Sequence, residues 1–120
     1  MKRILVVEDD KNIQRLLQEE LTDEGYGIDI VSDGKEALAY LEGANGQKPD
    51  LIILDLRMPR MNGFETMGNI IKSRQSTPVI IHTAYSSYRD DVMVMAADAY
   101  IEKSHDLTKL KETIKELIGE

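Results

Sequence analysis

Residues 51–63 read LIILDLRMPRMNG: four apolar residues, a carboxylate, and then a proline and an Asn-Gly turn signal. The apolar run Leu51–Leu54 is typical of a strand that is buried on both faces. Asp55 follows at once, although a carboxylate is costly to bury without a partner. The rest of the chain must therefore supply groups that compensate this charge.

Other short apolar runs alternate with stretches of helical periodicity. The predicted strands are Arg3–Val7, Ile28–Val31, Leu51–Leu54, Val79–Ile81 and Tyr100–Ile101. Apolar residues at helical spacing predict five helices, around Leu17, Leu38, Ile70, Met95 and Ile114. Gly25 is predicted to end the first helix, and Asp33 and Asp106 are the predicted caps of the second and the last.

Strict alternation of strand and helix predicts an α/β fold with a doubly wound, parallel (βα)5 sheet, because parallel strands need crossover connections. Strand order 2-1-3-4-5 would make the first and third strands neighbours. In such sheets ligands bind beyond the C-terminal ends of the strands, where the strand order reverses. The length of 120 residues predicts one domain, residues 1–120.

Composition excludes several classes of function. The chain has no cysteine, which excludes disulfides, thiolate metal sites and a cysteine nucleophile and fits a cytoplasmic location. Its formal net charge of −7 argues against direct nucleic-acid binding, which needs a basic face. The apolar run after Lys2 and Arg3 is too short to be a signal peptide or to span a membrane.

Polar groups follow the ends of four predicted strands. Glu8, Asp9 and Asp10 follow the first strand and Asp55 follows the third, so these acids are expected at one edge of the sheet. Crowded carboxylates must protonate, pair or bind a cation, and a partly hydrated Mg²⁺ suits their number. Thr83 ends the fourth strand and Lys103 follows the fifth. This set predicts a phosphoryl site with Asp55 as the nucleophile.

Each residue taken alone has a structural explanation. Asp9 or Asp10 fits a helix cap, Thr83 a turn, Lys103 a surface position and Tyr100 a half-buried strand position. The two histidines, His82 and His105, are interpreted as structural, because two isolated histidines make a poor metal site. The phosphoryl site is favoured because four strand ends each offer a group that it needs.

Four segments resemble, in order and spacing, the signature blocks of the receiver domain of two-component response regulators. They are ILVVEDD, PDLIILDLRMPRMNG, PVIIHTAY and AYIEKS, and the resemblance covers essentially the whole chain. It implies the flavodoxin-like fold of that family, in the single-domain form of chemotaxis and sporulation regulators. By this resemblance Asp55 is the phosphoacceptor and Lys103 the lysine that senses the phosphoryl group.

The resemblance also implies the remaining roles. The Mg²⁺ ligands would be Asp9, Asp55 and the backbone carbonyl of Arg57, with Glu8 acting through water. Thr83 would be the switch hydroxyl and Tyr100 the switch aromatic residue. Arg57 and Tyr85 would flank the path of the water that hydrolyses the acyl phosphate, and neither side chain orients water readily.

Two departures from the family pattern stand out. Ser104 follows Lys103 where the family usually has a proline in a cis peptide, so the Lys103 backbone is expected to differ. The stretch between Thr83 and Lys103 is a couple of residues shorter than is usual in the family. The turn before Tyr100 reads Ala96-Ala97-Asp98-Ala99 and lacks the glycine that is common there. The fourth helix is therefore predicted to be short or irregular.

The sequence thus predicts a stand-alone receiver domain with no room for an output domain. It would accept a phosphoryl group from a histidine kinase or phosphotransfer protein and change its surface around the fourth and fifth strands and their helices. A downstream protein target is implied, with a monomer or a phosphorylation-dependent dimer as the oligomeric state. The domain would catalyse only its own phosphorylation and dephosphorylation.

Three alternatives belong to other classes. A receiver-like interaction module would never be phosphorylated, but Asp55, Thr83 and Lys103 are all present. A Mg²⁺-dependent phosphohydrolase with an aspartate nucleophile needs a second aspartate two residues on, where Arg57 stands. A nucleotide-binding flavodoxin-like protein would need a glycine-rich loop after the first strand, and none is found there.

Overall fold

The computed structural model describes residues 1–43, 48–55, 68–70, 72, 77–84 and 97–119. Within these ranges five strands form one parallel sheet in the order β2-β1-β3-β4-β5, which confirms the predicted order. The strands are β1 (Arg3–Val7), β2 (Gly27–Val31), β3 (Leu51–Leu54), β4 (Val79–Thr83) and β5 (Ala99–Glu102). Strands β2, β4 and β5 extend one or two residues beyond the predicted ranges, because their ladders continue at the ends.

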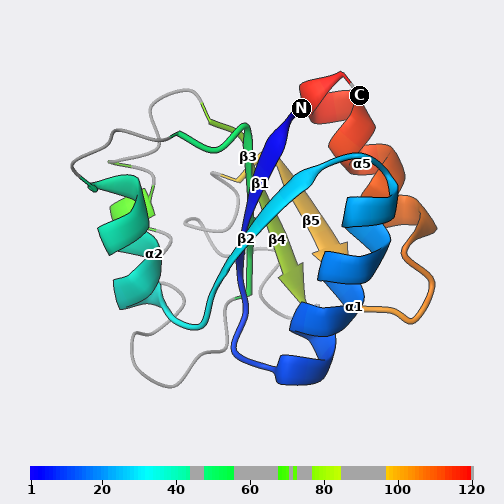
Figure 1. Ribbon diagram of the computed structural model, residues 1–120, viewed down its shortest axis with the longest axis horizontal. Helices are drawn as coiled ribbons and strands as arrows, with labels where there is room; N and C mark the ends of the chain where they lie inside the picture. Colours follow the sequence, from blue (N-terminus) through cyan, green and yellow to red (C-terminus); the bar gives the residue numbers. More distant parts are fainter. Residues whose placement is uncertain (44–47, 56–67, 71, 73–76, 85–96, 120) are drawn as a thin grey trace.

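Helices cover both faces of this sheet. Helices α1 (Lys11–Asp23) and α5 (Thr108–Ile118) lie on one side and α2 (Gly34–Leu41) lies on the other (Figure 1). Successive strand residues point to opposite faces, so Ile4 and Val6 pack with α1 and α5, while Leu5 and Val7 pack with α2. These four residues are fully buried, as the apolar composition of the strand predicts.

The helix ends follow from short-range hydrogen bonds. The Asp10 carboxylate accepts from the backbone N–H groups of Asn12 and Ile13 and caps α1. Gly25 follows the other end with a φ of 96°, a left-handed conformation that favours glycine. Asp33 caps α2 as predicted. The predicted cap of the last helix was one residue early: Leu107 occupies the cap position of α5, and the Asp106 carboxylate accepts from the Thr108 N–H.

Two predicted helices lie mostly or wholly outside the described residues. Of the third, residues 68–70 are described and helical, and the Ile70 side chain is fully buried against the α2 side of the sheet. The fourth lies outside the described ranges except for its predicted last residue, Ala97, which is not helical. Before β5, Asp98 joins the start of β4: its carboxylate accepts from the Val79 N–H at 2.8 Å.

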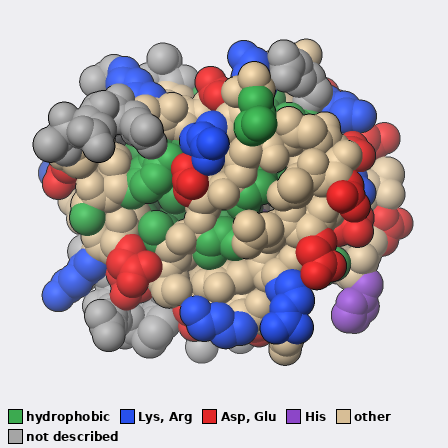
Figure 2. Space-filling model, in the orientation of Figure 1, with side chains coloured by type: hydrophobic (Ala, Val, Ile, Leu, Met, Phe, Trp, Pro, Cys, Tyr) green, Lys and Arg blue, Asp and Glu red, His purple; other side chains and the backbone are tan. Residues whose placement is uncertain are grey.

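No helix within the described ranges is long and apolar enough to cross a membrane. The acidic composition is not evenly spread over the surface in view. Figure 2 shows acidic side chains gathered along the side of the molecule on which α1 and α5 lie.

Candidate functional site

The ends of β1 and β3 carry the predicted carboxylates. These strands are hydrogen-bonded neighbours, with Val7 opposite Leu54, so Glu8 and Asp55 follow them side by side. The backbone fixes both positions: the Glu8 N–H donates to the Val31 carbonyl and the Asp55 N–H donates to the Val7 carbonyl, each at 3.0 Å. Only 2% of Glu8 and 4% of Asp55 is exposed. The backbone thus holds two acids side by side at the C-terminal ends of two neighbouring strands.

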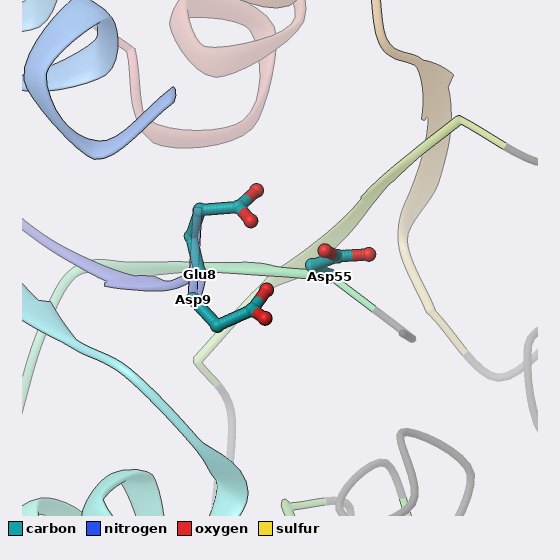
Figure 3. A group of neighbouring side chains, drawn as sticks. All are labelled: Glu8, Asp9 and Asp55. Atoms are coloured by element: carbon teal, nitrogen blue, oxygen red, sulfur yellow. The ribbon is translucent and has the colours of Figure 1, made fainter. Parts of the chain in front are cut away.

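Three carboxylates converge at this edge. One oxygen each of Glu8, Asp9 and Asp55 lies within 4.8 Å of the others, which is close enough to hold one metal ion. Figure 3 shows the three side chains gathered around a common space, Glu8 and Asp9 from the end of β1 and Asp55 from the end of β3. Oxygen ligands of this kind suit a hard divalent cation such as Mg²⁺.

Lys103 supplies the positive charge of the site. Its Nζ lies 2.9 Å from Glu8 Oε1 and 3.0 Å from Asp55 Oδ2, and only 17% of its side chain is exposed. The surface position that Lys103 taken alone suggests is therefore wrong. One ammonium among three carboxylates leaves excess negative charge that a divalent cation would offset.

The electrostatics of the site reflect this crowding. Burial and the nearby Asp55 charge raise the pKa of Glu8 to about 7, although Lys103 acts in the opposite direction. Burial alone would lower the pKa of Lys103, but the hydrogen bonds and charges of Glu8 and Asp55 outweigh it and raise that pKa. The lysine is therefore held in its charged form.

Thr83 and Tyr100 lie on the neighbouring strands. Thr83 is fully buried at the end of β4, and its carbonyl accepts from the Lys103 N–H at 2.7 Å. Tyr100 lies opposite Ile81 on β5 and packs, half-buried, against the cluster on the α2 side. Ile81 and Thr83 are two residues apart on β4, so Thr83 and Tyr100 share one face of the sheet.

The remaining predicted residues divide into several groups. Arg57 and Tyr85 lie outside the described residues. Asp10 caps α1, which is the structural role that the sequence suggested for Asp9 or Asp10 taken alone. The Asp10 N–H also donates to Glu8 Oε2. No peptide bond within the described part of the chain is cis, and the Ser104 Oγ accepts from the Asp106 N–H in the turn that follows Lys103.

Sequence reasoning missed Gln14 on α1. Its Nε2 donates to the Glu8 carbonyl and, at 3.3 Å, to the Ser32 Oγ. The Gln14 side chain thereby links the segment between β1 and α1, which contains Glu8, to the segment between β2 and α2, which contains Ser32. A polar residue on a predicted helix gives no sign of this contact, because the contact depends on how the two connections lie in the folded chain.

Comparisons with known proteins agree on one family. The family model for the response regulator receiver domain matches residues 4–115. Response regulator ArlR of Staphylococcus aureus strain Mu50 is 42% identical over 120 residues, which cover 98% of this chain and 53% of that protein. The chain thus spans about half the length of the curated relatives it matches.

Solved structures show the same likeness. Response regulator protein TrrA from Thermotoga maritima, in complex with Mg²⁺-BeF, has a TM-score of 0.88 and 47% identity over 98% of this chain and 99% of that chain. A chain in the complex of histidine kinase ThkA with TrrA gives a TM-score of 0.89, with the same identity and coverage. A CheY-like receiver domain protein from Methanospirillum hungatei has a TM-score of 0.90 and 34% identity, over 99% of this chain and 94% of that chain.

Proposed function

Since the chain belongs to the response regulator receiver domain family, we propose that Asp55 is its phosphoacceptor in two-component signalling. The observation that carries this proposal is the contact of Lys103 with Asp55, 3.0 Å long, beside two further carboxylates at the same sheet edge. A carboxylate held at the end of a buried strand is fixed in position for attack on an incoming phosphorus atom.

The residues present fit the Mg²⁺ that this chemistry uses. Asp9 and Asp55 would hold the ion with the backbone carbonyl of Arg57, and Glu8 would act through water. When bound, Mg²⁺ neutralises charge on the phosphoryl oxygens and on the attacking carboxylate. The three carboxylates supply the hard oxygen ligands that the ion prefers.

In the proposed reaction a carboxylate oxygen of Asp55 attacks phosphorus and forms a C–O–P bond. The bond between phosphorus and the imidazole nitrogen of a kinase or phosphotransfer protein breaks, and its electron pair stays on that nitrogen. Lys103 and the Thr83 hydroxyl then contact phosphoryl oxygens and offset their charge. The structure of TrrA with histidine kinase ThkA supports a kinase as the donor.

The proposed output is a rearrangement of the surface formed by β4, β5, α5 and the fourth helix. Thr83 and Tyr100 share one face of the sheet, so a shift of the Thr83 side chain toward a phosphoryl group changes the space available to Tyr100. A downstream protein that binds one arrangement better would read the signal. The proposed state is a cytoplasmic monomer or a dimer that forms on phosphorylation.

We assign the chain to phosphoacceptors rather than to hydrolases. Arg57 stands where an aspartate-nucleophile hydrolase needs its general acid, so this chain would turn over only its own acyl phosphate. A receiver-like module that is never phosphorylated is the alternative that labelling tests.

The test is incubation with acetyl phosphate or carbamoyl phosphate and Mg²⁺, read by intact-mass spectrometry. We expect one phosphoryl group, stable in acid and labile to base and hydroxylamine, because a carboxylate nucleophile gives an acyl phosphate. Asp55→Asn should abolish the mass increase, whereas Asp23→Asn, an exposed aspartate at the end of α1, should leave it intact. Undiminished labelling of the Asp55 variant would refute the assignment.

A further inference from the structure

Asp9 is held differently from the other two carboxylates of the acidic site. Glu8 and Asp55 are buried, whereas Asp9 is half-buried in the segment between β1 and α1. Within the described part of the chain, no hydrogen bond holds Asp9 itself. The direction of its side chain therefore depends on how the main chain on either side of it is fixed.

Gln14 on α1 fixes the main chain on the Glu8 side. Its Nε2 donates to the Glu8 carbonyl. This carbonyl belongs to the planar peptide unit that joins Glu8 to Asp9, so a bond to it fixes the plane from which the Asp9 main chain starts. The N–H of Glu8 is held as well, because it donates to the Val31 carbonyl at 3.0 Å. Beyond Asp9, the Asp10 N–H donates to Glu8 Oε2 at 3.1 Å.

Ser32 orients the amide of Gln14. The Ser32 Oγ accepts from Gln14 Nε2 at 3.3 Å. A side-chain amide has two N–H donors, so it can make this bond and the bond to Glu8 at the same time. The main chain of Ser32 is held in turn, because its N–H donates to Glu36 Oε1 at 2.7 Å. Gln14 thus connects an anchored turn between β2 and α2 to the segment that carries Asp9.

We propose that Gln14 is a positioning residue for the Mg²⁺ site: its amide holds the Glu8–Asp9 peptide so that the Asp9 carboxylate stays beside Asp55 (Figure 3). This rests on the proposed function in taking Asp9 and Asp55 as ligands of the ion. Gln14 acts only through the main chain. Without its bond, part of the free energy of Mg²⁺ binding would be spent on ordering Asp9, so the affinity would fall.

The test is isothermal titration of the unphosphorylated protein and of Gln14→Met with Mg²⁺. Methionine is unbranched and of similar length but has no N–H donors. We expect the variant to bind Mg²⁺ about three- to tenfold more weakly, because one hydrogen bond that positions a ligand is lost. Gln18→Met makes the same change at an exposed position about one turn further along α1, and it should bind as the wild type does. Equal affinity of Gln14→Met and the wild type would overturn the proposal.

A second variant separates positioning from a general loss of stability. Ser32→Ala removes the hydroxyl that orients the amide, so it should weaken Mg²⁺ binding about two- to threefold in the wild type and no further in the Gln14→Met background. Additive effects of the two changes would contradict a pathway through Gln14. Urea unfolding without Mg²⁺ shows whether each variant is folded, and lower stability with unchanged Mg²⁺ affinity would leave Gln14 a structural role alone. If Gln14→Met does not fold, Ser32→Ala decides the matter.

Labelling with acetyl phosphate keeps this result apart from the role of Asp55. Gln14→Met retains Asp55, so at saturating Mg²⁺ we expect the same mass increase as in the wild type. Normal labelling with unchanged Mg²⁺ affinity would reject the positioning role and leave the phosphoacceptor in place. A wild type that binds Mg²⁺ but takes up no phosphoryl group would reject the phosphoacceptor, while the comparison of Mg²⁺ affinities would still decide the role of Gln14.

Discussion

Lys103 Nζ lies 3.0 Å from Asp55 Oδ2, so a charge pair connects the ends of β5 and β3 across β4, which lies between them in the sheet. The same ammonium reaches Glu8 beyond the end of β1 at 2.9 Å. One side chain therefore joins the ends of three strands, and its removal should be felt throughout the acidic site.

Replacing Lys103 with Met should tighten Mg²⁺ binding. The change removes the positive charge and keeps an unbranched side chain, so the carboxylates would attract the cation more strongly, on the order of tenfold in affinity. Isothermal titration with Mg²⁺ measures this. Lys103→Arg should stay near the wild type, and so should Lys111→Met, which removes a lysine paired with Glu20 away from the site. Unchanged or weaker binding by the Met variant would contradict the expectation.

His82→Phe should reduce the loss of stability in mild acid. The pKa of His82 is lowered to about 4 by burial and the nearby Lys103 ammonium, with Asp55 acting in the opposite direction. The unfolded chain, with a pKa near 6.5, binds the proton more readily, so stability is lost as the pH falls from about 6.5 toward 4. At pH 5 this contribution is about 2 kcal/mol.

Urea unfolding at pH 7 and pH 5 measures the effect. The wild type and His105→Asn, which alters an exposed histidine, should lose stability in parallel, whereas His82→Phe should lose less. Equal losses in all three proteins would show that His82 does not titrate across this range.

The acyl phosphate should decay slowly. Hydrolysis needs a water in line with the bond from Asp55 to phosphorus, and Arg57 and Tyr85 are bulky residues that do not readily orient it. Substituting Asn at 57 and Glu at 85 should shorten the half-life severalfold, measured by intact mass after removal of the phosphodonor. A half-life that stays the same would remove this explanation.

The predicted fourth helix, from Ser86 or Ser87 to about Ala97, should be weakly protected and most altered by activation. Its apolar stripe offers only Val92, Met95 and Ala96, and a helix of this length needs tertiary packing to persist. Amide hydrogen exchange with and without beryllofluoride is the measurement, with α1 as the internal reference. Protection equal to that of α1 before activation, and unchanged after it, would be the opposite result.

The fold could be predicted because its determinants are local. The apolar runs predicted where each strand ends, and the strand order then predicted that Glu8, Asp9 and Asp55 lie at one edge of the sheet. The structure has these three residues together. Asp33 and Gly25 marked helix ends by their own backbone preferences. Each inference needed only neighbours in sequence and the rule that parallel strands end together.

Long-range contacts could not be predicted in this way. Gln14 reaches the Glu8 carbonyl only because two connections lie side by side. The burial of His82 Nδ1 with no hydrogen-bond partner among the described residues likewise depends on tertiary packing. The sequence placed Lys103 near the acids but could not show that it contacts Glu8 as well as Asp55. Such details depend on side-chain packing between segments that are distant in the chain.

The bond from the Lys103 N–H to the Thr83 carbonyl, 2.7 Å long, divides the site into a fixed part and an adjustable part. It continues the ladder between β4 and β5, so the main chain at both residues is held as firmly as the sheet itself. Any displacement on phosphorylation must therefore come from side-chain rotation at these two residues, or from main chain beyond them. The sheet acts as the stationary frame against which a change of one functional group is converted into a change of surface shape.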